Sequence, residues 1–99
     1  MTQEELKMAL ELHKKWLSNE SDGVRLDLSG TDFYGLDLSG LDLWGTNLSS
    51  ADLSGVDLRY ANLKDANLRF ANLNGANLRH ANLSGSNLRR TVLSYADLS

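Results

Sequence analysis

A five-residue unit repeats without loss of register from residue 26 to residue 99. Each unit has a small or aliphatic residue, then Asp or Asn, then Leu, then two variable residues. Phe33 replaces the Leu once, and Val92 replaces the Asp or Asn once. Such an internal repeat constrains the fold more strongly than the propensity of any single stretch. The central positions of the units are Leu28, Phe33, Leu38, Leu43, Leu48, Leu53, Leu58, Leu63, Leu68, Leu73, Leu78, Leu83, Leu88, Leu93 and Leu98.

The period of five decides how the backbone must run. It matches neither the 3.6-residue period of a helix nor the two-residue alternation of a strand, so no long regular element can bury every Leu. The backbone must turn at each unit and close into coils whose interior holds the Leu and the small residues. Stacked coils would lie about 4.7–4.9 Å apart, the spacing of hydrogen-bonded strands. The repeat therefore predicts an all-β solenoid, and the period alone allows three or four sides per coil.

Three consecutive units carry a resemblance to a known family. Residues 61–65, 66–70 and 71–75 read ANLKD, ANLRF and ANLNG, and this pattern resembles the pentapeptide-repeat family. The resemblance covers residues 26–99 and implies a right-handed, four-sided β-helix with four units per coil, or about 3.7 coils. It also implies that side chains twenty residues apart stack in interior ladders. One ladder would hold Leu28, Leu48, Leu68 and Leu88, and the next would hold Phe33, Leu53, Leu73 and Leu93.

Residues 1–25 lack the repeat and have the pattern of a helix followed by a linker. Thr2 and Glu5 have the spacing of a capping box, and Gly23 closes a segment without an apolar stripe. We expect this helix to cap the first coil, where Leu26, Leu36 and Leu41 fill a wider interior, because terminal repeats need polar covers. A membrane-surface or partner-binding helix is the weaker alternative, since Glu outnumbers Lys. The covering residues are expected to be Leu6, Ala9, Leu10, His13, Trp16 and Leu17.

The last coil has no comparable cover in the sequence. An uncovered coil is an open sheet edge, which favours pairing with another chain. The sequence therefore predicts a tail-to-tail homodimer, with Val92, Leu93, Tyr95 and Leu98 as the candidate interface. Two alternatives stay open, namely that the chain is a fragment of a longer array or that its last unit frays in water.

Charge is divided unevenly along the chain. The net charge is −3, but residues 1–58 carry four basic and eleven acidic side chains, whereas residues 59–99 carry six basic and two acidic ones. A candidate surface patch consists of Arg59, Tyr60, Arg79 and His80, since Arg and aromatic side chains together bind nucleic acids. We expect no direct nucleic-acid binding, because the basic residues lie on different sides of a net negative protein. Arg side chains lying over aromatic rings are the favoured interpretation.

Enzymatic and metal chemistry find little support. There is no Cys, and the acidic residues of the first coil point outward on different sides, so they cannot converge on one ion. The Ser residues occupy repetitive outward positions without an oriented His, and Gly residues fall at turns rather than in a phosphate-binding motif. We therefore expect neither catalysis nor a cofactor. No apolar stretch approaches the ~20 residues of a membrane span and no leader is evident, so we expect a cytoplasmic protein without membrane contact.

Two functional classes follow from these observations. The first is a non-enzymatic interaction module, a rigid solenoid that presents outward side chains to a protein partner or joins copies through its last coil. The alternative is modulation of DNA gyrase by DNA mimicry, a role that the resemblance implies for some family members with strongly acidic, dimeric rods. The basic half of this chain departs from that pattern. An engineered array and a free-standing bacterial module both fit the sequence.

Overall fold

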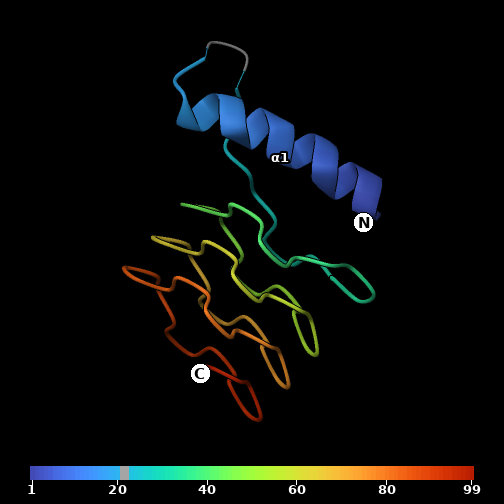
Figure 1. Cartoon of the computed structure of the whole chain (residues 1–99), viewed down its shortest axis with the longest axis vertical. Coiled ribbons are helices and arrows are strands. Elements are labelled where there is room, and N and C mark those ends of the chain that lie inside the picture. The colour runs from blue at the N-terminus through green and yellow to red at the C-terminus, as the bar shows by residue number, and fades with distance from the viewer. Residues whose placement is uncertain (21–22) are drawn as a thin grey trace.

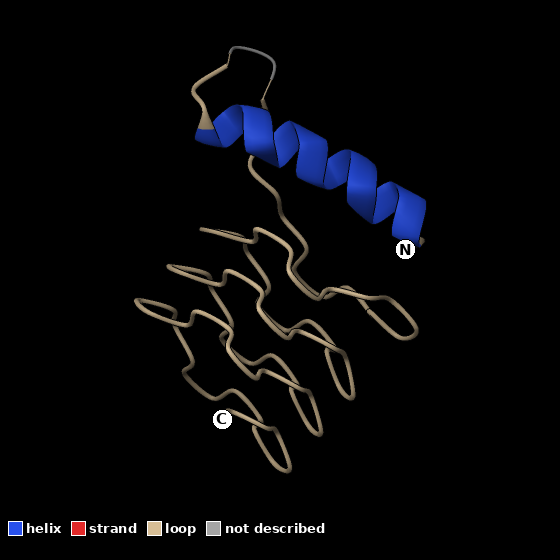
Figure 2. Ribbon diagram, in the orientation of Figure 1, coloured by secondary structure: helices blue, strands red, loops and turns tan. Residues whose placement is uncertain are grey.

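The computed structural model describes residues 1–20 and 23–99, so the helix and linker predicted for residues 1–25 include two residues outside the described part. Helix α1 (Gln3–Leu17) is followed by a chain that winds into stacked coils (Figure 1). Figure 2 shows that α1 lies across the N-terminal end of this stack. The C-terminus lies at the opposite end of the stack (Figure 1).

Stacked coils are joined by parallel bridges between residues twenty apart, from Asp27 with Asn47 to Asn77 with Asp97. At each bridge the amide after the Asp or Asn donates to the next coil, as Leu48 N–H does to Asn67 O at 2.8 Å. Four five-residue units therefore separate stacked positions, and the predicted ladders are confirmed. The bridges are isolated rather than parts of continuous strands, because each unit keeps one residue in extended pairing before the backbone turns.

The second position of each unit controls the turn that follows it. The Asp or Asn side-chain Oδ1 accepts the backbone N–H two residues later, as in Asp27 to Ser29 at 3.0 Å and Asn77 to Arg79 at 3.1 Å. This is an Asx turn, which holds the chain in a bend that no regular element supplies. The fifth position then has positive φ, 77° at Gly35 and 62° at Phe70. Gly adopts this conformation freely, whereas other residues adopt it at a cost.

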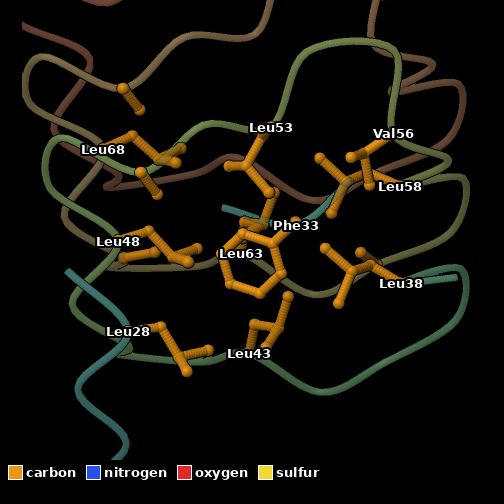
Figure 3. Close-up of a cluster of buried hydrophobic side chains, with 14 of the residues drawn as sticks. Leu28, Phe33, Leu38, Leu43, Leu48, Leu53, Val56, Leu58, Leu63 and Leu68 are labelled. Carbon is orange, nitrogen blue, oxygen red and sulfur yellow. The ribbon is translucent and has the colours of Figure 1, made fainter. Parts of the chain in front are cut away.

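The interior of the coils is a continuous apolar core. The ring of Phe33 lies among leucine side chains that point inward (Figure 3). Every central residue from Leu28 to Leu78 is at most 2 % exposed, and the small residues Ala61, Ala66, Ala71 and Ala76 are equally buried. The prediction that leucines at steps of five converge on one interior is confirmed. Leu36 and Leu41 differ from expectation, because they are only half-buried and pack against the core from its edge.

Helix α1 begins as the sequence predicts. Thr2 Oγ1 accepts the N–H of Glu5 at 3.1 Å, and Glu5 Oε1 accepts the N–H of Thr2 at 2.9 Å, which completes the capping box. Leu6 and His13 are fully buried, and Ala9 and Leu10 pack against the core. Trp16 and Leu17 are half-buried. The apolar stripe therefore faces the coils, as its spacing predicts.

Candidate functional site

His13 joins α1 to the coils through both ring nitrogens. Its Nδ1 accepts the backbone N–H of Leu26 at 3.0 Å, and its Nε2 lies 2.7 Å from the carbonyl oxygen of Trp44. Because a carbonyl only accepts, Nε2 carries the proton and the imidazole is neutral. The side chain is 1 % exposed. Both nitrogens are occupied by structural hydrogen bonds, so His13 is not available as a catalytic base.

Aromatic and polar contacts surround this junction. Trp16 stacks on His13 with ring centroids 5.5 Å apart, and the Trp44 ring lies 6.4 Å from Trp16. Arg25 places its guanidinium 5.7 Å from the Trp16 ring and donates to Gly45 O from Nε and Nη2 at 3.0 and 2.8 Å. The Trp44 side chain thus lies against the helical segment. The role of Arg25 was not evident from the sequence, because its partner is a backbone carbonyl.

A second attachment lies near the start of α1. The Gln3 side-chain amide donates to Asp37 O at 3.0 Å, and its oxygen accepts the Asp37 N–H at 3.1 Å. Gln3 therefore pairs with an outer backbone edge as a strand would. Nothing in the spacing of residues 1–17 marks Gln3, because this contact depends on how the helix is rotated on the coil.

The candidate C-terminal interface lies on the last coil. Leu98 is 55 % exposed and Val92 46 %, Tyr95 is almost fully exposed, and Leu93 is half-buried. Leu83 and Leu88 are also half-buried, in contrast to the buried leucines of the preceding coils. Within the described residues, the amides of these leucines have no acceptor on another coil. This end of the stack presents apolar side chains and backbone donors together.

The candidate patch around Tyr60 is brought together only in part. The Tyr60 and His80 rings stack with centroids 4.9 Å apart, as their twenty-residue spacing predicts. Arg59 instead binds Asp57 through its guanidinium at 2.7 Å, and Arg79 lies 3.9 Å from Asp97. Both arginines are therefore balanced by carboxylates, and this side is not a positive track. The expected stacking of Arg over an aromatic ring occurs elsewhere, at Phe70.

Two kinds of hydrogen bond lower the pKa of the outward Asp residues. The pKa of Asp37 is lowered most by the hydrogen bond from the backbone N–H of Ser39 and less by the bond from the Ser39 hydroxyl. At Asp52 and Asp97 the order is reversed, and the hydroxyl of the Ser two residues later lowers the pKa most. The pKa of Asp57 is lowered chiefly by its hydrogen bond with the Arg59 guanidinium. These carboxylates are used in turns, and no group of three potential metal ligands occurs among the described residues.

Comparison with known proteins identifies the repeat. The family model for pentapeptide repeats matches the chain with eight copies, over residues 27–65, 37–75 and 71–99. The chain is a pentapeptide-repeat protein. The Asx turns and the stacking at twenty residues are thus features of a pentapeptide-repeat solenoid. No curated protein sequence matches this pentapeptide-repeat protein.

Solved structures of other pentapeptide-repeat proteins resemble it. One, from the thylakoid lumen of Arabidopsis thaliana, is 38% identical with a TM-score of 0.69, over 72% of this chain and 49% of that chain. This pentapeptide-repeat protein therefore spans about half the length of that relative. A second, from Nostoc PCC 7120, is 34% identical with a TM-score of 0.47, over 87% of this chain and 71% of that one. HetL from Nostoc, involved in heterocyst differentiation regulation, is 32% identical with a TM-score of 0.43, over 78% and 42%.

An open groove separates α1 from the coil beside it in this pentapeptide-repeat protein. It has a volume of about 390 Å³, and Leu10 and Leu41 form its apolar part beside the buried Leu6. Charged residues of α1, among them Lys7 and Glu11, line it together with Asp42. Among the described residues there is no helix with the length and apolar character needed to cross a membrane.

Proposed function

We propose that this protein is a non-enzymatic interaction module that self-associates through its last coil. In this proposal the solenoid is right-handed and four-sided, has about 3.7 coils and is capped by α1. The observation that carries the proposal is the difference between the two ends of the core. Leu28, Phe33 and Leu38 are at most 2 % exposed near α1, whereas Leu98 at the other end is 55 % exposed.

Buried contacts and hydrogen bonds between α1 and the coils support the role of α1 as a cap. Leu6 is fully buried, and His13 and Gln3 each bond to the coil backbone. A cap of this kind supplies the apolar contacts that an end coil lacks on one side. We therefore treat residues 1–25 as the capping unit and residues 26–99 as the repeat unit.

Self-association is favoured by the chemistry of the last coil. The half-buried leucines at this end resemble a core cut open, and exposed apolar patches mark interaction sites. Backbone donors without acceptors on another coil add the pairing capacity of an open sheet edge. A tail-to-tail dimer would cover Val92, Leu93, Tyr95 and Leu98 in one step.

The test is the oligomeric state of the 99-residue chain and of two lysine variants. We expect light scattering to give the mass of a dimer, and Leu98→Lys to shift the equilibrium toward monomer because a charge then faces its symmetry mate. Met8→Lys is the control, since Met8 lies on α1, away from the last coil, and is 69 % exposed. A monomeric wild type at millimolar concentration, or equal effects of both variants, would contradict self-association.

The proposal of a non-enzymatic role rests on how the titratable groups are used. Both ring nitrogens of His13 make structural hydrogen bonds, and the His80 ring stacks on the Tyr60 ring at the surface.

Gyrase modulation by DNA mimicry remains the weaker hypothesis, because residues 59–99 carry a net charge of +4. A supercoiling assay with a quinolone tests it, and rescue of supercoiling by micromolar protein would reverse this ranking. Cytoplasmic location and bacterial origin stay predictions, which cell fractionation of the source organism would test.

A further inference from the structure

Two sides of the solenoid carry the same arrangement of arginine beside a corner residue. On one side Tyr60 N–H donates to Arg79 O at 3.0 Å, and on the other Phe70 N–H donates to Arg89 O at 3.1 Å. Arg59 and Arg79 follow the bridged residues Asp57 and Asn77 by two positions, and Arg69 and Arg89 follow the bridged residues Asn67 and Asn87 in the same way. The two sides can therefore be compared position by position.

They differ in their counter-charges. On the first side Asp57 and Asp97 each lie within ion-pair distance of an arginine. On the second side the corresponding turn residues are Asn67 and Asn87, which supply no charge. None of the carboxylates in the described part of the chain pairs with Arg69, Arg89 or Arg90. Three cations on one side are left without internal neutralisation in a protein whose net charge is −3.

The second side also exposes an aromatic ring. Phe70 is 52 % exposed, and the guanidinium carbons of Arg69 and Arg90 lie 5.6 and 5.9 Å from its ring centroid. These contacts hold the guanidinium groups near the ring, which reduces the entropy lost when they bind a ligand. Like charges directly opposite on neighbouring strands are destabilising. An anionic partner would remove this repulsion. We call Arg69, Phe70, Arg89 and Arg90 the basic surface.

We propose that the basic surface docks a short acidic segment of a partner protein. Guanidinium groups bind carboxylates bidentately, and such charge-assisted hydrogen bonds are the stronger ones. The exposed part of Phe70 offers an apolar contact beside them. The partner fitted by this surface is therefore a segment in which an apolar side chain is flanked by Glu or Asp.

A nucleic acid fits the basic surface less well. Two guanidinium groups already lie over the Phe70 ring, where a stacked base would have to bind. The column through Asn67 and Asn87 leads through Asn47 to Asp27, and residues 1–58 carry a net charge of −7. A long polyanion would meet this acidic half, whereas a short acidic segment would not.

The inference rests on the proposed function in that the solenoid presents side chains to a protein partner. It does not rest on self-association, which light scattering measures separately. The probe is the fluorescein-labelled peptide Gly-Glu-Glu-Phe-Glu-Glu-Gly, with binding followed by anisotropy at low and high salt. A peptide with Gln in place of Glu and a labelled oligothymidylate are the comparison ligands.

Two double variants with the same loss of charge provide the decisive comparison. We expect Arg69→Gln with Arg89→Gln to weaken binding of the acidic peptide by about tenfold. Arg59→Gln with Arg79→Gln should change it by less than about twofold, because those cations already have partners. Phe70→Gly should also weaken binding while the melting temperature is retained, since Gly tolerates the positive φ at this position.

Three results would overturn the proposal. Equal weakening by both double variants would mean that only overall charge matters. No binding of the acidic peptide at low salt would mean that the surface is merely solvated. Tighter binding of the oligothymidylate, lost with Arg69 and Arg89, would replace the protein partner by a nucleic acid. A monomeric wild type would leave the inference intact, and failed peptide binding would leave self-association intact.

Discussion

The neutral ring of His13 accepts the backbone N–H of Leu26 at 3.0 Å, and Leu26 is the first residue of the first repeat unit. The same ring donates to the carbonyl oxygen of Trp44, which lies in the fourth repeat unit. A single side chain of α1 thus satisfies one donor and one acceptor at the end of the solenoid. Because buried backbone groups without partners are costly, this contact links the stability of the helix to that of the coils.

Replacing His13 by Leu should destabilise the whole protein. The N–H of Leu26 and the carbonyl of Trp44 would lose their partner, and each unsatisfied buried group costs about 1–3 kcal/mol. We therefore expect a loss of about 2–4 kcal/mol in the free energy of unfolding, measured by urea denaturation. Met8→Ala is the control, because Met8 is 69 % exposed on the same helix and should change stability by less than about 0.5 kcal/mol. Equal midpoints for the His13 variant and wild type would refute this linkage.

Trp16→Ala tests whether α1 stabilises coils that it does not touch. The Trp16 ring contacts His13, Trp44 and Arg25, but it is only half-buried. We expect a cost of about 2 kcal/mol, below the 3–5 kcal/mol of a fully buried Trp. Hydrogen exchange should accelerate at amides of the middle coils, such as Leu63 N–H, because repeat units are stable only together. Faster exchange confined to α1 would show that the helix frays alone.

The sequence predicted the repeat unit better than it predicted the attachment of the helix. A period of five specifies which side chains point inward, so the burial of Leu28 to Leu78 and the twenty-residue stacking were both predictable once the resemblance was seen. The capping box was predictable because both of its bonds are local. The contact of Gln3 was not, since it depends on the rotation of α1 over the coil. The contact of Arg25 was not, since its partner is a backbone carbonyl.

The role of Asp and Asn in the turns was not predicted from the sequence. One side-chain hydrogen bond joins two of these residues in stacked coils, from Asn62 Nδ2 to Asp42 Oδ1 at 3.1 Å. Their general use is the Asx turn, which either residue type can make with the amide two residues on. The same two-residue spacing brings the Arg59 guanidinium to the Asp57 carboxylate. The sequence-based description of the candidate patch around Arg59 did not include this ion pair.

Thr46 offers a stabilising substitution. Its Oγ1 is buried and has no hydrogen-bond partner among the described residues, in a position of the repeat that holds Ala in seven units and Val in one. Thr46→Val keeps the shape and removes the unpaired hydroxyl, so we expect a gain of about 1–2 kcal/mol in the free energy of unfolding. Thr91→Val is the matched control and should lower the free energy of unfolding, because Thr91 Oγ1 donates a hydrogen bond to Leu68 O at 2.7 Å that the variant loses. A loss of stability in the Thr46 variant would mean that its hydroxyl is satisfied in solution.

The Asp-rich first coils should make the protein sensitive to acid. Because hydrogen bonds lower the folded-state pKa of Asp27, Asp37 and Asp52, these groups contribute stability above their unfolded pKa of about 3.9. This contribution is lost as the pH falls through the lowered folded-state values. Replacing all three residues by Asn keeps the Asx acceptor, as at Asn82, where both Ser84 N–H and Ser84 Oγ donate to Oδ1. We expect the triple variant to lose less stability than wild type between pH 5 and pH 2, measured by urea midpoints at each pH, and parallel curves would exclude a role for these carboxylates.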